Sequence, residues 1–521
     1  MSAGPSSPAD GPAGGASALR PTAPRHARRR RFRSAVGLAV LNALVPGTAF
    51  LAAGRRVLGA VTLALFVLLV GAGIWLATGG RRTVLLTAVD TDQLLWVVGG
   101  IAVIALLWVA VVVVGYLLLR PRPLPGGKHA LGAFVVLLLV AAIAVPAVWA
   151  SRLALAQRDL IAGVFDEDGE SATVEDTPDP FGDQERVNVL LLGGDGGEGR
   201  EGVRTDTVIV ASIDTDTGDT TLFSLPRNLE DLPFPAGSPL AALYPDGFDS
   251  GSESESLLNA VYRNGPADHP DVLGPTDDPG ADFLKLGVGE ALGLDIDYFV
   301  LVNLDGFSRL VDALGGITVN VNYYVPVGGD PGTGSLPDAY IAPGPDQEMD
   351  GATALAFARG RFGLTDYDRM DRQRCTIDAI IDAADPVTLL RQYQRLAATT
   401  QDIVSTDIPR SALDDFVDLG LLVKDADVRS VVFDPSLIDP AYPDYDLMRE
   451  IVAVSLGEEP AGAEEPQDTT SSAPASTSAA PSTGSAPPTQ DAAADVADAC
   501  AYDPVKAQEA RAAGEPPTRG R

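Results

Sequence analysis

Histidine is nearly absent from this chain of 521 residues, which contains only His26, His129 and His269. They lie in a basic amino-terminal segment, between two apolar runs and in a polar insertion. This scatter argues against a Ser/His/Asp triad, a histidine-rich zinc site and a Cys/His nucleophile. The sequence also lacks a P-loop and a dinucleotide-binding fingerprint. A catalytic base, if the chain uses one, must therefore be a carboxylate.

Cysteine is almost as scarce, with Cys375 and Cys500 as its only two occurrences. One disulfide between them would fasten the end of the chain to an extracellular domain. Two unrelated thiols, one of them a small buried apolar side chain, are the alternative.

Positive charge is outweighed by negative charge, since 38 Lys and Arg face 70 Asp and Glu and the formal net charge is -32. So acidic a chain, with no DNA-binding motif, is unsuited to phosphate backbones, and we expect no nucleic-acid partner. Two dense arginine clusters stand out against this background. The first contains Arg200, Arg204, Asp206 and Arg227, and the second Arg359, Arg361, Arg369, Arg372 and Gln373.

Composition divides the chain into five parts. Residues 1–34 are basic and rich in small residues, and we expect a disordered cytosolic tail there. Residues 35–150 are strongly apolar, 151–184 are expected to form a linker, and 185–456 an acidic folded domain. Residues 457–521 form a low-complexity extracellular tail.

Three apolar runs are long enough to cross a bilayer. A fourth run, Ala35–Ala53, is interrupted by Asn42 and by Pro46-Gly47. The positive-inside rule places Arg120, Arg122 and Lys128 in the cytosol, which puts the large domain outside after three spans. The fourth run then lies in the interface or re-enters, whereas four spans would leave the domain in the cytosol. The predicted spans are Val57–Ala77, Leu94–Leu119 and Ala130–Ala150.

The soluble part alternates strand-like and helix-like patterns. This alternation predicts a layered α/β/α domain, and the hairpin joining 206–213 to 219–225 makes its central sheet mixed. The predicted strands are 187–193, 206–213, 219–225, 298–304, 317–323 and 428–433. The predicted helices are 257–262, 282–292, 305–314, 350–358, 368–384, 387–399, 412–423 and 445–456.

Two carboxylates at adjacent strand ends suggest a cation site. Asp195 lies in a glycine-rich loop after the first strand, and Asp206 begins the next one. Together they could hold Mg²⁺, which prefers oxygen ligands and accompanies phosphates. Acidic residues that merely cap turns are an equally simple interpretation.

The arginines suggest a phosphate site, because guanidinium groups remain charged and match phosphate oxygens. Arg227 follows a strand and a proline, at the kind of strand end where α/β domains bind ligands. Arg359 and Arg361 share a side if the segment between them is extended. Arg369, Arg372 and Gln373 fall on one face of the next helix. The alternative is a solvated surface balanced by neighbouring aspartates.

These motifs, in this order, resemble the LytR-CpsA-Psr family of cell-wall ligases. The most specific are VRTDTVIVAS, SLPRN, LLNAVY and ARGRFGLTDYDRMDRQR. The resemblance implies an extracytoplasmic α/β/α domain with an apolar pocket for a polyprenyl (pyro)phosphate lipid. It also implies transfer of a phospho-linked glycopolymer from that lipid to a peptidoglycan hydroxyl, with magnesium. Helices 283–292 and 307–314 could line the pocket, although core packing is the commoner role of such residues.

Carried over by motif, the resemblance assigns roles to individual residues. Asp206, Arg227, Arg359 and Arg361 are the expected catalytic residues, with Asp206 activating the acceptor hydroxyl. Asp195 and Asp206 are the expected magnesium ligands. The expected substrate-binding residues are Arg204, Arg369 and Gln373 by this resemblance, together with Arg372, from its place on the helix face, and Asn259 of LLNAVY.

The chain departs from the family pattern in two places. Asn228 replaces an aspartate after Arg227, and Leu257 replaces a lysine before the asparagine motif. High use of Ala, Gly and Arg, together with several spans, looks like an actinobacterial version. Two alternatives stay open: a polyprenyl-pyrophosphate phosphatase, and a lipid-binding envelope regulator without catalysis.

Overall fold

The computed structural model describes residues 25–121, 126–165, 170–174, 180–182, 184–195, 203–384, 404–458 and 493–519. Backbone contacts divide the chain into two compact units. The first comprises residues 1–79 and 97–151, and the second comprises residues 80–96 and 152–521.

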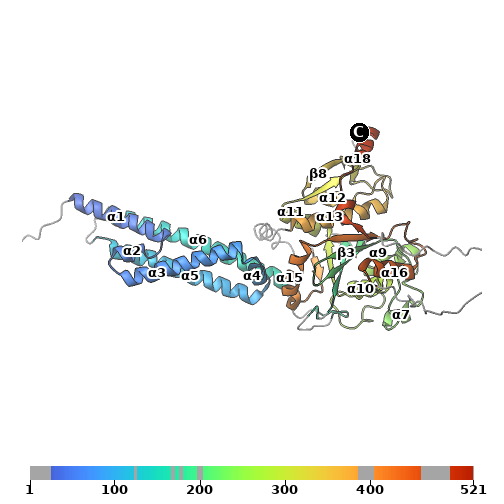
Figure 1. Ribbon diagram of the computed structural model, residues 1–521, viewed down its shortest axis with the longest axis horizontal. Coiled ribbons are helices and arrows are strands. Elements are labelled where there is room, and N and C mark those ends of the chain that lie inside the picture. The colour runs from blue at the N-terminus through green and yellow to red at the C-terminus, as the bar shows by residue number, and fades with distance from the viewer. Residues whose placement is uncertain are drawn as a thin grey trace, which may run out of the picture. The chain divides into compact units, whose positions relative to one another are not determined.

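Three helices are long and apolar enough to cross a membrane: α3 (Arg56–Thr78), α5 (Thr91–Leu119) and α6 (Gly126–Val164), drawn in blue to cyan in Figure 1. Each contains one predicted span. Helix α6 does not end with the apolar run near Ala150, so the first part of the predicted linker is wrong and is helical instead. Its later residues are good helix formers such as Ala, Leu, Arg and Gln, which explains the extension.

The fourth apolar run is interrupted where the sequence indicated. Helix α1 (Arg25–Leu44) ends before Pro46-Gly47, and α2 (Thr48–Ala52) follows. The buried Asn42 side chain accepts a hydrogen bond from the Gly47 backbone at 2.9 Å, which satisfies the polar groups of the break. Residues 25–34, expected to be disordered, instead form the start of α1 because arginine is a good helix former.

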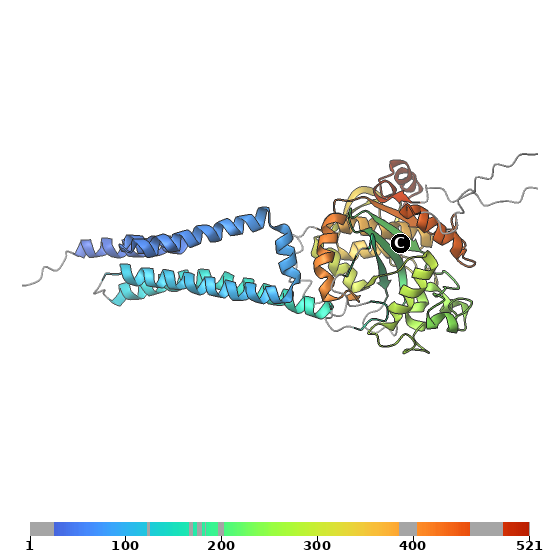
Figure 2. The ribbon, with the colours of Figure 1, turned by 60° about the horizontal axis from the view of Figure 1, so that its bottom comes forward.

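The second unit contains a seven-stranded mixed sheet in the order β11-β10-β3-β2-β1-β4-β9 (Figures 1 and 2). Strand β1 pairs with β2 antiparallel and with β4 parallel. Its continuous apolar run follows from this central position, where both faces are covered. The strands are β1 (Arg186–Gly194), β2 (Thr205–Asp214), β3 (Thr220–Leu225), β4 (Tyr298–Asn303), β9 (Val404–Thr406), β10 (Val428–Val432) and β11 (Ala494–Asp495).

Helices cover both faces of this sheet, which confirms the α/β/α architecture. In Figure 1, β3 lies between α12 and α13 on one side and α9, α10 and α16 on the other. Alternation within β1 explains the two layers: Leu190 and Leu192 join the larger core under α10, and Leu191 faces the opposite layer. The helices are α9 (Leu258–Asn264), α10 (Pro279–Leu292), α16 (Tyr445–Leu456), α11 (Leu304–Leu314), α12 (Gly351–Arg359) and α13 (Asp366–Ala383).

Two small hairpin-like sheets extend the α12–α13 side. Strand β5 (Ile317–Val321) pairs with β8 (Gly344–Met349), and β6 (Val325–Val327) pairs with β7 (Ala339–Ile341). The sequence predicted only the first of these four strands. The predicted helix 387–399 lies outside the described residues.

The remaining elements are short or peripheral. Helix α10 begins earlier than predicted because Asp278 caps it and Pro279 fits its first position. The other elements are α4 (Arg81–Val89), α7 (Pro239–Leu243), α8 (Glu253–Ser256), the 3₁₀ helix η2 (Arg410–Ala412), α15 (Leu413–Val423), α17 (Val496–Ala499) and α18 (Pro504–Ala513).

The domain does not end at residue 456, so the predicted low-complexity tail is wrong for its last part. Residues 493–519 supply β11, α17 and α18, with Val496 and Ala507 fully buried. Apolar burial of these few side chains and pairing of β11 with β10 hold the segment on the domain.

Candidate active site

A cavity of about 640 Å³ lies between the sheet and the layer formed by α11, α12 and α13. Its volume falls within the range of small-molecule sites, roughly 300–1,000 Å³. Its apolar walls come from both layers, and its polar residues are gathered at strand and helix ends. The principal apolar lining residues are Leu191, Ile209, Val300, Val302, Phe307, Leu310, Leu355, Ile377, Ile380 and Ile381. The principal polar lining residues are Asp195, Asp206, Thr207, Arg359, Arg361, Arg369 and Gln373.

Only one of the two helices proposed to line a pocket does so. Phe307 and Leu310 of α11 reach the cavity. The buried side chains of residues 283–292 instead pack into the larger core on the other face of the sheet. The amphipathic pattern alone did not distinguish a cavity wall from an ordinary core.

Arginines from both sequence clusters meet beside the polar end of the cavity. Arg359, Arg361 and Arg369 line it, whereas Arg227 is not among its described lining residues and reaches it through Asp206. Arg227 Nη1 lies 2.8 Å from Asp206 Oδ1, and its Nε lies 3.5 Å from Asp366 Oδ1. Asp366 also lies 3.8 Å from Arg361 and 3.0 Å from Arg369. Segments more than 130 residues apart in sequence therefore meet at one shared carboxylate, that of Asp366.

Exposure separates these arginines. The side chain of Arg369 is only 5% exposed, whereas those of Arg227 and Arg361 are 30% and 34% exposed. Arg227 and Arg361 are thus partly open to an incoming ligand, and Arg369 forms the floor beneath them.

Helix α13 presents its site residues through a defined start. Thr365 and Asp368 form a capping box, in which each side chain accepts a hydrogen bond from the other's backbone. One turn apart, Arg369 and Gln373 both reach β2: Arg369 Nη1 donates to the Asp206 carbonyl at 2.7 Å, and Gln373 Nε2 donates to Thr207 Oγ1 at 2.8 Å. These bonds fix α13 against the strand that carries Asp206.

Arg359 and Arg361 flank the end of α12, and both line the cavity. Gly360 between them packs so closely that an added Cβ would clash with the Pro326 carbonyl. Glycine is therefore required for the turn that brings the two arginines to the same cavity.

Arg372 was predicted to bind substrate, but it is not among the described residues that line the cavity. Its guanidinium group is buried and donates to the carbonyls of Phe357 and Gly360 and to the hydroxyl of Tyr323. On a helix, Arg372 lies about 100° away from Gln373, which turns it toward β5 rather than into the cavity. It holds the backbone that carries Arg359 and Arg361.

Arg204 lies beside the cavity rather than among the described residues that line it. Its guanidinium group is 2.6 Å from Glu255 Oε1, and Arg263 contacts the other oxygen of that carboxylate. Glu255 is a partner that the sequence did not indicate, because nothing distinguishes it from the other acidic residues. Asp366 is one of the neighbouring aspartates that the alternative interpretation placed beside the second arginine cluster. Arg200 lies outside the described residues.

The residues expected to hold magnesium lie together. Asp195 and Asp206 both line the cavity, and Asp195 Oδ1 accepts a hydrogen bond from the Arg204 backbone at 2.8 Å. Asn259 Nδ2 donates to Asp206 at 3.2 Å, while its buried Oδ1 has no hydrogen-bond partner within the described part of the chain. Two carboxylates and an unsatisfied amide oxygen suit a hard cation that keeps several waters and phosphate ligands. The described residues contain no group of three or more His, Cys, Asp or Glu that could hold a metal alone.

The charges of the site shift two pKa values. Burial would raise the pKa of Asp206, but Arg227, Asn259 and Arg369 outweigh it and hold the pKa below its ordinary value. Burial lowers the pKa of Arg361, and repulsion from Arg227 and Arg369 lowers it further. Asp206 and Asp366 act on Arg361 in the opposite direction and raise its pKa, but burial is the largest effect.

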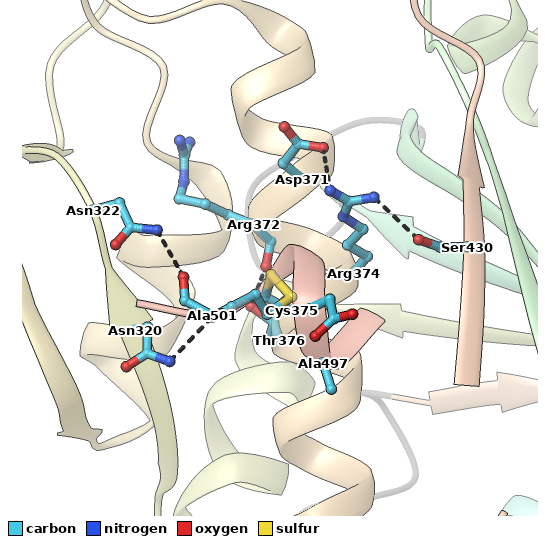
Figure 3. The surroundings of a disulfide bond; sticks show 12 residues. Asn320, Asn322, Asp371, Arg372, Arg374, Cys375, Thr376, Ser430, Ala497 and Ala501 are labelled. Carbon is cyan, nitrogen blue, oxygen red and sulfur yellow. Dashed lines mark hydrogen bonds and ion pairs between the residues drawn. A yellow bond between two sulfur atoms is a disulfide. The ribbon is translucent and has the colours of Figure 1, made fainter. Parts of the chain in front are cut away.

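Cys375 and Cys500 form a disulfide, with Cα atoms 5.6 Å apart (Figure 3). Cys375 lies on α13, two residues after Gln373. The bond therefore links the carboxy-terminal segment directly to the helix that carries part of the arginine cluster.

The chain is similar in sequence to known proteins of one family. The sequence profile described as the LytR_cpsA_psr family matches residues 164–434, just over half of the chain. The Enterococcus faecalis protein named polyisoprenyl-teichoic acid–peptidoglycan teichoic acid transferase TagU is 29% identical over 232 residues, which cover 43% of this chain and 62% of that protein. The probable cell wall biosynthesis protein LcpB of Corynebacterium glutamicum is 31% identical over 212 residues, covering 40% of this chain and 41% of that protein.

Among solved structures, the crystal structure of protein gbs0355 from Streptococcus agalactiae aligns with a TM-score of 0.41 and 20% identity. The alignment covers 57% of this chain and 94% of that one. This chain spans less than two thirds of the length of the Enterococcus and Corynebacterium relatives. Because the family profile covers more than half of its residues, the chain belongs to the LytR_cpsA_psr family.

Proposed function

We propose that the chain transfers a phospho-linked glycopolymer from a polyprenyl diphosphate lipid to a hydroxyl of peptidoglycan. The observation that carries this proposal is an arginine cluster at the polar end of an apolar cavity. A diphosphate suits the cluster, and a polyprenyl chain suits the apolar walls. The printed name of the Enterococcus relative describes a reaction of the same kind.

In the proposed reaction, the acceptor hydroxyl attacks the phosphorus atom that bears the glycan. A new oxygen–phosphorus bond forms, and the bond from that phosphorus to the bridging oxygen of the diphosphate breaks. Polyprenyl monophosphate leaves with the electron pair, and the hydroxyl proton goes to a base. Arg227, Arg359 and Arg361 stabilise the charge on the non-bridging oxygens, which is the main requirement of phosphoryl transfer.

Asp206 is the proposed base. Its low pKa keeps it ionised at neutral pH but makes it a weak proton acceptor. Phosphate groups that bind Arg227 and Arg369 offset the positive charge around Asp206. Donor binding thereby moves the pKa of Asp206 back toward its ordinary value and improves it as a base.

Mg²⁺ is the proposed cofactor, with Asp195 and Asp206 as its protein ligands and Asn259 beside them. When bound, it would add positive charge at the phosphate oxygens. Arg204 is retained as a proposed contact of the donor, which must displace it from Glu255.

We further propose a multi-pass membrane location with the catalytic domain outside the cell. Helix α4 lies between the first two candidate spans, and Arg82 of α4 pairs with Asp418 of α15. This ion pair supports a topology in which the α3–α5 connection and the domain share one side of the membrane. A membrane location also raises the effective concentration of a lipid-linked donor.

Transfer can be tested with the full chain in detergent, a polyprenyl diphosphate-linked oligosaccharide, Mg²⁺ and peptidoglycan. Covalent attachment of the oligosaccharide to peptidoglycan supports the proposal. Release of phosphate without attachment would point to a phosphatase, and binding without turnover to a regulator.

Arg361→Ala is the variant that we expect to lose transfer activity. We expect transfer to fall roughly 100-fold, as when one charge-stabilising donor is removed from other active sites. Arg309→Ala, a change at an exposed arginine of α11, is the control and should keep the wild-type rate. Equal rates for the two variants would refute the assignment of Arg361.

A further inference from the structure

The carboxy-terminal segment 493–519, called the strap below, contacts α13, the end of β5 and the residues that flank β7. Its Cys500 is bonded to Cys375 of α13, and its strand β11 pairs with β10. The proposed reaction assigns no role to it. A continuous series of residue contacts connects it to the arginine cluster.

The first step is the attachment of the strap to the end of β5. Asn320 Nδ2 donates to the Cys500 carbonyl, and Asn322 Nδ2 donates to the Ala501 carbonyl, each at 3.1 Å (Figure 3). The backbone N–H of Asp503 donates in return to Asn322 Oδ1 at 2.8 Å. Three hydrogen bonds beside the disulfide therefore hold the strap in a fixed position against the end of β5.

The second step passes through the next residue, Tyr323. Its ring lies 4.9 Å from the Lys506 ammonium group on the strap side, and its hydroxyl accepts a hydrogen bond from Arg372 at 2.8 Å on the inner side. Arg372 in turn donates to the carbonyls of Phe357 and Gly360. Gly360 is the residue between Arg359 and Arg361.

The strap also holds the hairpin β6–β7. The Arg519 backbone donates to the Pro337 carbonyl at 2.8 Å, and Arg511 donates to the Pro343 carbonyl at 2.5 Å. The tip of this hairpin supplies residues 328–331 to the cavity lining. One segment thus supports both the arginine-bearing turn and the hairpin against which Gly360 packs.

We infer that the strap is a positioning element, which fixes Arg359 and Arg361 in the orientation that receives the diphosphate of the donor. This inference rests on the proposed function, because it assigns the arginines to a diphosphate. A strap that only stapled the domain would stabilise the fold without a specific effect on diphosphate recognition.

The test compares two ligands of one hydrocarbon chain: geranylgeranyl diphosphate and geranylgeraniol, which lacks the phosphates. Binding to the full chain in detergent is measured at a temperature where circular dichroism shows each variant folded. The first variant is Cys375→Ser/Cys500→Ser. The second is Asn320→Ala/Asn322→Ala, which keeps the disulfide, and Glu509→Gln on exposed α18 is the control.

We expect both strap variants to bind the diphosphate about tenfold more weakly, with unchanged affinity for the alcohol, while the control matches wild type. Loss of both affinities in equal measure, or of neither, would show that the strap does not position the arginines. A wild-type chain that binds the two ligands equally would overturn the proposed function, and the positioning role with it.

Discussion

The type of partner distinguishes a ligand-binding arginine from a structural one. Arg361 faces a carboxylate at 3.8 Å, a contact that an incoming phosphate can replace. Arg372 faces backbone carbonyls and a tyrosine hydroxyl in a buried position, and no ligand can replace those acceptors. Spacing along α13 did not separate the two roles, since residues three and four apart share a helix face.

Arg372→Met should therefore destabilise the domain. It leaves two buried carbonyls without their donor, at about 1–3 kcal/mol for each unsatisfied group. We expect the thermal unfolding midpoint to fall by roughly 5 °C or more. Arg361→Met, at a partly exposed position, should leave the midpoint nearly unchanged. If Arg361→Met lowered the midpoint more than Arg372→Met, Arg372 would again be a candidate ligand-binding residue.

Asp206 makes a prediction about pH. Its folded-state pKa lies below its ordinary value of 3.8, so its contribution to stability is present above that value. That contribution is lost as the pH falls through the lower, folded-state pKa. We expect Asp206→Asn to be less stable than wild type at pH 7, with the difference shrinking below about pH 4. Unfolding midpoints measured between pH 3 and pH 7 would reveal a constant difference if the ion pair with Arg227 were unimportant.

At this scale the sequence predicted residue types better than partners. Arg227, Arg361, Arg369 and Gln373 meet as expected because their motifs lie at strand and helix ends. The counter-ion Glu255 could not be predicted, since it is one of 70 acidic residues, and neither could the pairing of Asp366 with the distant Arg227. Their roles depend on which segments the fold brings together.

At the scale of elements, long apolar patterns gave reliable predictions. Strand β1 and helix α16 follow their predicted ranges closely because each has enough apolar residues to define a period. Strands β6 and β7 have three residues each, too few to show alternation. The apolar residues of the strap are mostly alanines, with Val496, Tyr502 and Val505 as its large ones, and Cys500 was the only indication that the strap returns to the domain.

The cavity between α12 and the sheet gives a testable prediction. Leu355 lines the cavity, and Leu355→Trp should fill part of it. We expect weaker binding of geranylgeranyl diphosphate and unchanged binding of inorganic pyrophosphate, because only the hydrocarbon site is blocked. Leu243→Trp, at an exposed leucine of α7, is the control. Equal affinity of both variants for the lipid would place the tail elsewhere.

At the scale of the whole molecule, the proposed membrane location requires that α4 and the domain lie on the same side of the membrane. Both native cysteines are in the disulfide, so a single introduced cysteine can report its own exposure. We expect a membrane-impermeant maleimide to label Thr83→Cys on intact cells, because the proposed topology puts α4 on the same side of the membrane as the domain. Gly127→Cys, beside the basic residues near Lys128, should react only after the cells are opened. Labelling of Gly127→Cys alone on intact cells would reverse the topology.

Photo-crosslinking tests most directly whether the cavity holds the lipid tail of the donor. The probe is a polyprenyl diphosphate that carries a diazirine at the far end of its tail. After irradiation of the full chain in detergent, mass spectrometry locates the modified peptides. We predict modification within 351–359 and 366–383, suppressed by unlabelled polyprenyl diphosphate and by Leu355→Trp. Modification confined to the membrane helices, unaffected by either, would show that the cavity does not hold the lipid.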